Sequence, residues 1–358
     1  MRTSSALLMA AGIAGGAVAV ASAAAALKSW GAVARRARKI AASASLDGQV
    51  VLITGGSRGL GLQLAREFAA HGCRIAICAR NAAQLEAARA DLERRGAAVL
   101  AIRCDLTERA QVEQLVGRVT EHFGRIDILV NNAGSIAVGP MESVRVEDFE
   151  QAMAIMFWAP VYASLAVIPQ MRARRSGRIV NITSIGGKIS VPHLVPYSCA
   201  KFAAVALSEG MRTELARDGI SVTTIVPGLM RTGSHLNAEF KGNHAREYLW
   251  FSLSAASPLT AISAERAARD IVQATRWGLP ERVLSVPANL AARLHGLLPE
   301  LTIPVMTLVN QYLLPSGSDP SRRKGREAER ELDSRLLRVV NTLGRSAAQD
   351  LNQTPVTA

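Results

Sequence analysis

Aromatic residues and cysteines are scarce in this chain of 358 residues. Phenylalanine, tryptophan and tyrosine make up 4% of it, and without aromatic and basic residues interleaved in a recognisable motif the sequence argues against nucleic-acid binding. The four cysteines, Cys73, Cys78, Cys104 and Cys199, form no CxxC pair or other metal-ligand spacing, so no metal site is predicted. Three of them lie in or beside apolar runs, and we expect reduced core thiols in a cytosolic compartment.

Acidic residues are also in deficit, with 29 Asp and Glu against 42 Lys and Arg and a formal net charge of +13. Such an excess of positive charge attracts polyanions, such as nucleic acid, anionic lipid or a phosphorylated cofactor. Apolar residues make up 49% and charged residues 20% of the chain. This ordinary balance excludes general disorder and allows a full hydrophobic core.

Charge is missing altogether from Ala6 to Leu27. At about 1.5 Å per residue this stretch could span a bilayer core of roughly 30 Å. The basic residues between Lys28 and Lys39 follow it, and by the positive-inside rule they keep the next domain in the cytoplasm. We expect an uncleaved anchor and a membrane-associated protein; a signal peptide, or a soluble or surface-bound helix, is the alternative.

Short apolar runs alternate with helical segments from Gln49 onwards. The expected strands are Val50–Thr54, Arg74–Ala79, Ala98–Arg103, Ile126–Asn131, Arg178–Thr183, Ile220–Val226 and Arg282–Val286, and the expected helices include Leu60–His71, Ala82–Arg95, Arg109–Phe123 and Tyr197–Arg217. Strands that are apolar throughout are covered on both faces and are joined by right-handed crossovers. The pattern predicts an α/β fold, a doubly wound parallel sheet of the Rossmann type.

The chain divides into four parts by composition. Residues 1–45 form the apolar anchor and a basic linker, 46–287 the main domain, 288–315 an apolar extension, and 316–358 a polar basic tail. The extension is rich in leucine and interrupted at Pro299 and Pro304. It could pack on the core, cover an apolar substrate, or bind a surface as an amphipathic segment. We expect the tail to be mobile or loosely helical.

A glycine-rich turn joins the first strand to the first helix, from Thr54 to Gly61. Glycines let the backbone approach a pyrophosphate closely, and the helix N-terminus supplies free N–H donors and a positive dipole end. Because the turn lies between a strand and a helix, the sequence predicts a dinucleotide site.

Tyr197 and Lys201 are four residues apart on an expected helix, so both project from one face. A free tyrosine has a pKa near 10, and a nearby ammonium or an oxidised nicotinamide would lower that pKa. Ser184 ends a strand thirteen positions upstream of Tyr197 and could hydrogen-bond a substrate oxygen. Catalysis of proton transfer by Tyr197 is therefore predicted.

These motifs together resemble the short-chain dehydrogenase/reductase family. The resemblance rests on TGxxxGxG at Thr54–Gly61, NNAG at Asn131–Gly134, Ser184 with the YxxxK pair, and Pro227-Gly228 with Thr232, and it covers roughly Leu46 to Val286. It implies that Tyr197 is the acid/base, that Lys201 tunes it and holds the nicotinamide ribose, and that Ser184 orients the substrate. The implied reaction moves a hydride between a nicotinamide and a carbonyl or alcohol.

Cofactor choice depends on the end of the second strand, where an acid would select NAD and an arginine accommodates a 2′-phosphate. Ala79 stands at the acid's position and Arg80 follows, while Arg58 in the glycine turn offers a second cation. NADP is therefore expected, with NAD less favoured. The expected cofactor-binding residues are Gly55, Ser57, Arg58, Gly59, Leu60, Gly61, Arg80, Asp105, Leu106, Asn132, Ala133, Gly134, Tyr197, Lys201, Pro227, Gly228 and Thr232, of which Asp105 and Leu106 resemble the family's adenine-contacting pair.

One position departs from the family pattern. Met156 stands where members usually place an asparagine that supports a water relay to the lysine, and a thioether is a poor hydrogen-bond partner. The alternative function is therefore a membrane-tethered NADP-binding protein with little turnover. A hydrophobic ketone or alcohol is the expected substrate, because the flanking residues are mostly apolar, namely Ala137, Val138, Ile189, Val191, His193 and Leu194. A homo-oligomer is possible.

Overall fold

A computed structural model describes residues 45–256, 261–332 and 348–353. The predicted anchor at Ala6–Leu27 and its basic cluster lie outside the described residues. The described residues of 46–275 and 279–353 form one compact unit, and the features below belong to it except for residues 276–278.

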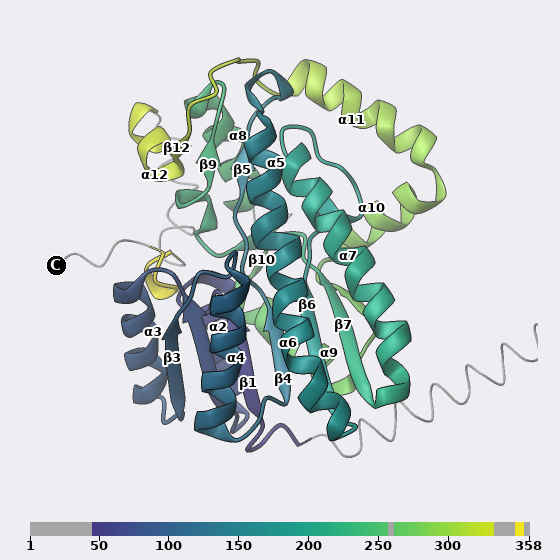
Figure 1. The fold of residues 1–358 in the computed structure, drawn as a ribbon. Coiled ribbons are helices and arrows are strands. Elements are labelled where there is room, and N and C mark those ends of the chain that lie inside the picture. Colours follow the sequence, from purple (N-terminus) through teal and green to yellow (C-terminus); the bar gives the residue numbers. More distant parts are fainter. Residues whose placement is uncertain (1–44, 257–260, 333–347, 354–358) are drawn as a thin grey trace, which may run out of the picture. The chain divides into compact units, whose positions relative to one another are not determined.

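Seven parallel strands form the central sheet, in the order β11-β7-β6-β4-β1-β2-β3 (Figure 1). Their bounds are β1 Val50–Thr54, β2 Arg74–Ala79, β3 Val99–Arg103, β4 Ile128–Asn131, β6 Gly177–Ile182, β7 Ile220–Val226 and β11 Glu281–Val283. The predicted doubly wound sheet is confirmed. Strand β11 ends three residues before the predicted bound, because Ser285 caps the next helix by accepting a hydrogen bond from the Ala288 amide.

Helices cover both faces of the sheet, as its apolar strands predicted. They are α2 Gly59–Ala70, α3 Ala82–Arg94, α4 Arg109–Phe123, α5 Val146–Met153, α6 Ala159–Ala173, α7 Val195–Leu215 and α9 Ala264–Trp277. One core cluster joins the sheet to α2, α3 and α9, and a second joins it to α4 and α6. In Figure 1 helices α4, α6 and α7 lie in front of the sheet.

Between α5 and α6 the chain makes a π-helical turn over Ala154–Trp158. The combined stretch Val146–Ala173 is the one described segment long and apolar enough, by length and composition, to cross a membrane. Its α6 part packs into the second core cluster through Ala163, Val167 and Met171, none of which is exposed. This stretch therefore forms part of the domain core.

Shorter elements build a lobe above the carboxyl ends of the strands. They are β5 Ala137–Val138, β8 Leu229–Arg231, β9 Glu239–Phe240, α8 His244–Ala256, β10 Ala261–Ser263, β12 Arg323–Lys324 and α12 Gly325–Ala328, with 3-10 turns at Met141–Ser143, Ile185–Gly187, Ser234–Leu236 and Glu329–Glu331. A further 3-10 turn, Ala216–Asp218, joins α7 to the amino end of β7. Strand β12 pairs antiparallel with β9, and β9 pairs parallel with β5.

The described part of the C-terminal segment, residues 316–332 and 348–353, is more ordered than predicted. A mobile or loosely helical tail was expected from Ser316, but β12 extends a sheet and α12 packs against α8. Ion pairs explain the difference, because Arg322 binds Asp148, which also pairs with Lys241 at 2.5 Å. The backbone of residues 348–353 also meets the glycine turn, where the Gly59 amide donates to the Leu351 carbonyl at 2.8 Å.

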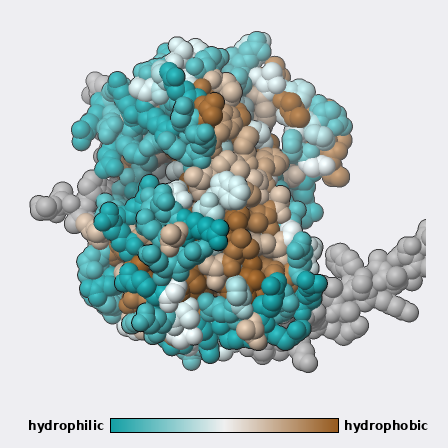
Figure 2. Space-filling model, in the orientation of Figure 1, coloured by the Kyte–Doolittle hydropathy of each residue, from teal (hydrophilic) through white to brown (hydrophobic). Residues whose placement is uncertain are grey.

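The apolar extension forms a hairpin of two helices, α10 Val286–Leu297 and α11 Pro299–Leu313. None of the side chains of α11 is buried, and in α10 Ala288 alone is. Core packing, one of the three predicted roles, is therefore wrong for this segment. The exposed apolar side chains, part of which reach the surface seen in Figure 2, are Val286, Leu290, Leu294, Leu297, Leu298, Leu301, Ile303, Val305, Leu308, Tyr312 and Leu313.

Three of the four cysteines are buried and Cys199 on α7 is exposed. Burial raises the pKa of Cys73 to about 12 and that of Cys104 to about 11, and it also raises the pKa of Cys78. The predicted buried thiols are confirmed.

Candidate active site

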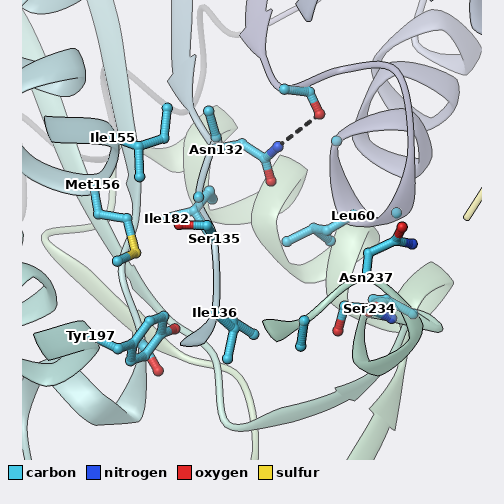
Figure 3. A pocket seen from close by; sticks show the side chains of 18 of the residues that line it. Leu60, Asn132, Ser135, Ile136, Ile155, Met156, Ile182, Tyr197, Ser234 and Asn237 are labelled. Atoms are coloured by element: carbon cyan, nitrogen blue, oxygen red, sulfur yellow. Dashed lines mark hydrogen bonds between the residues drawn. The ribbon is translucent and has the colours of Figure 1, made fainter. Parts of the chain in front are cut away.

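A cavity of about 1390 Å³ opens at the carboxyl ends of β1, β4, β6 and β7, where ligands bind in open α/β sheets. Figure 3 shows Met156 and Tyr197 on one side of it and Leu60, Ser234 and Asn237 on the other. Every predicted catalytic residue lines this cavity, and so does every predicted cofactor-binding residue except Asp105.

The glycine turn is shaped by close contacts as much as by backbone freedom. Gly55 has φ +65°, and a Cβ on Gly61 would lie 2.2 Å from the Gly55 carbonyl oxygen. Any side chain at Gly61 would therefore displace the turn. The Asn132 side-chain amide donates to the carbonyls of Thr54 (2.9 Å) and Gly55 (3.2 Å), and the Thr54 hydroxyl accepts from the Asn132 backbone. Asn132 thus holds the turn in place.

Two arginines line the cavity near this turn, Arg58 before α2 and Arg80 after β2. Arg58 is partly buried and Arg80 is exposed. Burial lowers the pKa of Arg58, and the positive charges of Arg326 and Arg80 lower it further. Three guanidinium groups therefore act on one another across the same cavity, and an anion placed among them would be stabilised.

The Asp105 side chain forms a local turn. Its carboxylate accepts hydrogen bonds from the Thr107 amide (3.0 Å) and the Thr107 hydroxyl (2.8 Å). Such a side-chain turn fixes the loop after β3. Leu106 and Thr107 line the cavity beside it.

Ser184, Tyr197 and Lys201 come together from the end of β6 and the first turns of α7. A hydrogen bond joins the hydroxyl groups of Ser184 and Tyr197, and the Ser184 oxygen also accepts from the Gly186 amide at 3.0 Å. Lys201 is buried, and its Nζ donates to the Ile182 carbonyl at 2.9 Å while lying 5.7 Å from the Tyr197 ring centroid. The predicted trio is assembled.

The pKa of Tyr197 shifts in the opposite direction from the one that the sequence predicted. Burial raises the pKa of Tyr197, and the hydrogen bond with Ser184 opposes that rise. Burial lowers the pKa of Lys201 to about 8. The lowering of the Tyr197 pKa that was expected from the ammonium is not seen, because burial is the largest influence on the phenol. At neutral pH the tyrosine is a phenol that can donate a proton, and the lysine is still mostly charged.

Met156 faces the cavity from the π-helical turn and is buried. Its Sδ would lie 3.7 Å from a Cβ on Gly134, and it packs in a small cluster with Ala200 and Tyr197. An apolar side chain thus adjoins the predicted catalytic residues at the place where the family pattern puts an amide.

Apolar side chains form the wall beyond Tyr197. Val191 and Leu194 line the cavity as the sequence indicated, whereas Ala137, Val138, Ile189 and His193 lie outside its lining. Trp250 and Phe251 of α8 complete this wall. The sequence analysis did not predict them, because α8 lies far from the motifs along the sequence. Further lining residues that the sequence did not indicate include Lys324, Arg326 and Gln353, which come from the segment that was expected to be a loose tail.

A glycine turn, a pair of arginines and a Ser–Tyr–Lys trio on one cavity define the class, a nicotinamide-dinucleotide-dependent oxidoreductase. The family model described as short chain dehydrogenase matches residues 49–241, more than half of the chain. The protein belongs to the short-chain dehydrogenase/reductase family.

Curated relatives agree with this assignment. The chain is 39% identical over 198 residues to a dehydrogenase/reductase SDR family protein 7-like of Anopheles gambiae, covering 54% of this chain and 62% of the relative. A protein of the same description from Drosophila melanogaster is 33% identical over 270 residues, covering 73% of this chain and 80% of the relative. Gluconate 5-dehydrogenase of Gluconobacter oxydans is 34% identical over 188 residues, covering 52% and 73%.

Solved structures share the fold. A short-chain dehydrogenase from Streptomyces avermitilis has a TM-score of 0.63 and 29% identity, over 74% of this chain and 98% of that one. Actinorhodin polyketide ketoreductase with NADPH has a TM-score of 0.60 and 28% identity, over 68% and 97%. A family member from Burkholderia phymatum in complex with NAD, at 22% identity, has a TM-score of 0.64 over 72% and 96%. Both nicotinamide dinucleotides thus occur among the neighbours.

Proposed function

We propose that the protein is an NADP-dependent oxidoreductase that interconverts a hydrophobic ketone and the corresponding alcohol. The observation that carries this proposal is the Ser184–Tyr197–Lys201 trio at the wall of the dinucleotide cavity. A bound nicotinamide supplies or accepts the hydride. Tyr197 gives its phenolic proton to the carbonyl oxygen in reduction, Ser184 hydrogen-bonds that oxygen, and the Lys201 charge stabilises the phenolate that remains.

Replacing Tyr197 by phenylalanine tests the reaction. Turnover of a substrate found by screening ketones and alcohols should fall by about 10²–10⁴-fold, because a positioned acid/base group is lost. The affinity for NADPH should stay nearly unchanged. A variant with wild-type turnover would show that another group transfers the proton.

Preference for NADP rests on charge at the end of β2, where Ala79 replaces an acid and Arg80 follows, with Arg58 lining the same cavity. Arg80→Asp should move the preference towards NAD, since it replaces a phosphate-pairing cation with an acceptor for ribose hydroxyls. Titration of the variant with NADPH and NADH measures this, and an unchanged ratio of the two affinities would place the 2′-phosphate elsewhere.

A second candidate function, nucleotide binding with little turnover, is favoured by Met156 alone. The thioether lies beside Tyr197 and cannot organise a proton relay. A protein that binds NADPH tightly yet reduces none of a broad set of carbonyl compounds would support this second function.

Membrane association is also part of the proposal. The exposed apolar hairpin α10–α11 supports it, together with the uncharged stretch Ala6–Leu27 and the net charge of +13. The catalytic domain would then face the cytoplasm. If the N-terminal stretch alone holds the protein on the membrane, deleting residues 1–40 should give a soluble and active protein. If the truncated protein stays on membranes, the hairpin binds them. Full-length protein that is soluble at low salt without detergent would refute the association.

An apolar band supports self-association. Trp158 of the π-helical turn, Leu165 of α6 and Phe202 of α7 are 47%, 63% and 42% exposed. Figure 2 shows apolar residues gathered on the face where α6 and α7 lie, and exposed apolar patches mark contact surfaces. Light scattering of full-length protein in detergent should report a dimer or larger assembly. Leu165→Glu should reduce that assembly to a monomer, and a wild-type monomer would contradict self-association.

A further inference from the structure

The C-terminal segment forms part of the wall of the dinucleotide cavity, although the matched family region ends at residue 241. Lys324, Arg326 and Gln353 line the cavity together with Arg58 and Arg80. All five polar side chains belong to the same compact unit.

Hydrogen bonds connect this segment to the glycine turn. The Leu351 carbonyl accepts from the Gly59 amide at 2.8 Å, and the Asn352 side-chain amide donates to the carbonyls of Ser57 and Gln84, both at 3.0 Å. Gly59 has φ +57°, and a Cβ there would lie 2.6 Å from the Gln353 side-chain nitrogen. The segment therefore lies directly on the turn that is expected to hold the pyrophosphate.

The same contacts fix Arg326. Its guanidinium donates to the Asn237 side-chain oxygen at 3.2 Å, and the Asn237 nitrogen donates to the backbone and side-chain oxygens of Gln353 at 2.9 and 2.8 Å. Gln353 in turn contacts Gly59, the neighbour of Arg58. A chain of contacts thus leads from Arg326 to the glycine turn.

The charges in this part of the cavity are not balanced. With the described residues, Arg58, Arg80 and Arg326 form no ion pair, whereas the neighbouring Arg322 and Lys324 both pair with Glu239. Lys324 thus has a carboxylate partner, whereas Arg326 has none among the described residues. Like charges held together near a partly buried arginine favour an anionic ligand, and a planar guanidinium suits phosphate oxygens. The Gly59 amide is already engaged by Leu351, which increases the need for other phosphate donors.

From this placement we infer that Arg326 binds a phosphate group of the dinucleotide, so that the C-terminal segment completes the cofactor site. The inference rests on the proposed function, since it takes the ligand to be a nicotinamide dinucleotide. The phosphate is either the 2′-phosphate, shared with Arg58 and Arg80, or the pyrophosphate above the glycine turn.

Calorimetric titration of the full-length protein with NADPH and with NADH tests this directly, without any turnover. Arg326→Ala should weaken NADPH binding about tenfold, because a charge-assisted contact is lost. Arg326→Gln should show a similar loss while retaining an amide that can reach Asn237, which guards against a folding defect. Arg330→Ala is the matched control, an exposed arginine of the same segment outside the cavity lining, and should stay within twofold of wild type.

The two nucleotides distinguish the two phosphates. Weaker binding of NADPH alone assigns Arg326 to the 2′-phosphate, and equal weakening of both nucleotides assigns it to the pyrophosphate. Wild-type affinity for both nucleotides in Arg326→Ala and Arg326→Gln overturns the inference and leaves the proposed function intact. A wild-type protein that binds neither nucleotide refutes the proposed function and the inference together.

Discussion

Replacing Glu247 should both destabilise the domain and loosen the substrate wall. The Glu247 carboxylate is fully buried, contacts His193 Nδ1 at 2.8 and 3.0 Å, and accepts from the Trp250 indole at 2.6 Å. Hydrogen bonds to a charged group contribute roughly 1.5–3 kcal/mol, and breaking a buried pair costs roughly 3–5 kcal/mol. We therefore expect Glu247→Ala to lower the free energy of unfolding by about 3–5 kcal/mol, and Glu247→Gln, which keeps one acceptor, by about 1.5–3 kcal/mol.

The functional effect follows from what Glu247 holds. His193 has φ +62°, a conformation that other contacts must maintain in a residue with a Cβ, and α7 with Tyr197 begins two residues later. Trp250 lines the cavity. Loss of the carboxylate should therefore raise KM for an apolar substrate several-fold and change kcat less.

Urea unfolding followed by circular dichroism measures the stability change, and steady-state kinetics with NADPH measures the split between KM and kcat. Glu121→Gln, an exposed carboxylate on α4, is the matched control and should change the free energy of unfolding by less than about 0.5 kcal/mol. If Glu247→Gln unfolds at the same urea concentration as the control, the buried contacts do not stabilise the fold as reasoned.

Further predictions concern the trio, its neighbour and the C-terminal segment. Burial lowers the pKa of Lys201 to about 8 and raises that of Tyr197. Carbonyl reduction should therefore be fastest below pH 8 and decline above it as the Lys201 ammonium loses its proton. A flat profile of kcat/KM from pH 6 to 10 would exclude this. Met156→Asn should raise kcat several-fold, because the amide would restore the water relay to Lys201. The buried amide should lower the free energy of unfolding by about 1–3 kcal/mol. Unchanged kinetics would show that no relay passes through this position. Asp148→Asn should destabilise the domain by about 3–5 kcal/mol in thermal or urea unfolding, because Lys241 stays buried without its partner, and a loss under 1 kcal/mol would contradict this.

Local pattern was enough to predict the sheet and the spacing of Tyr197 and Lys201, whereas the role of Ser184 beside them came from the resemblance to the family. The strands are continuous apolar runs, and β1, β2 and β7 begin and end at the predicted residues. The YxxxK pair needed only the helical spacing to place Tyr197 and Lys201 on one face. Both signals lie within a few residues, so no tertiary contact had to be known.

The features that the sequence did not predict depend on contacts between residues far apart in the chain, or on backbone geometry that has no signature in the sequence. The π-helical turn at Ala154–Trp158 has no distinct composition, although such turns are frequent at functional sites. Arg326 and Gln353 reach the cavity only because β12 pairs with β9 and Leu351 meets Gly59. The direction of the Tyr197 pKa shift also needed the burial that the fold imposes.

The cysteines give the protein a natural reporter position. Thiols react as thiolates, and the raised pKa values of Cys73, Cys78 and Cys104 keep these three protonated and shielded in the core. Cys199 is exposed and lies between Tyr197 and Lys201 on α7. A maleimide dye should therefore attach at one place in the native protein without mutagenesis. Its fluorescence would follow movements of the helix that carries Tyr197.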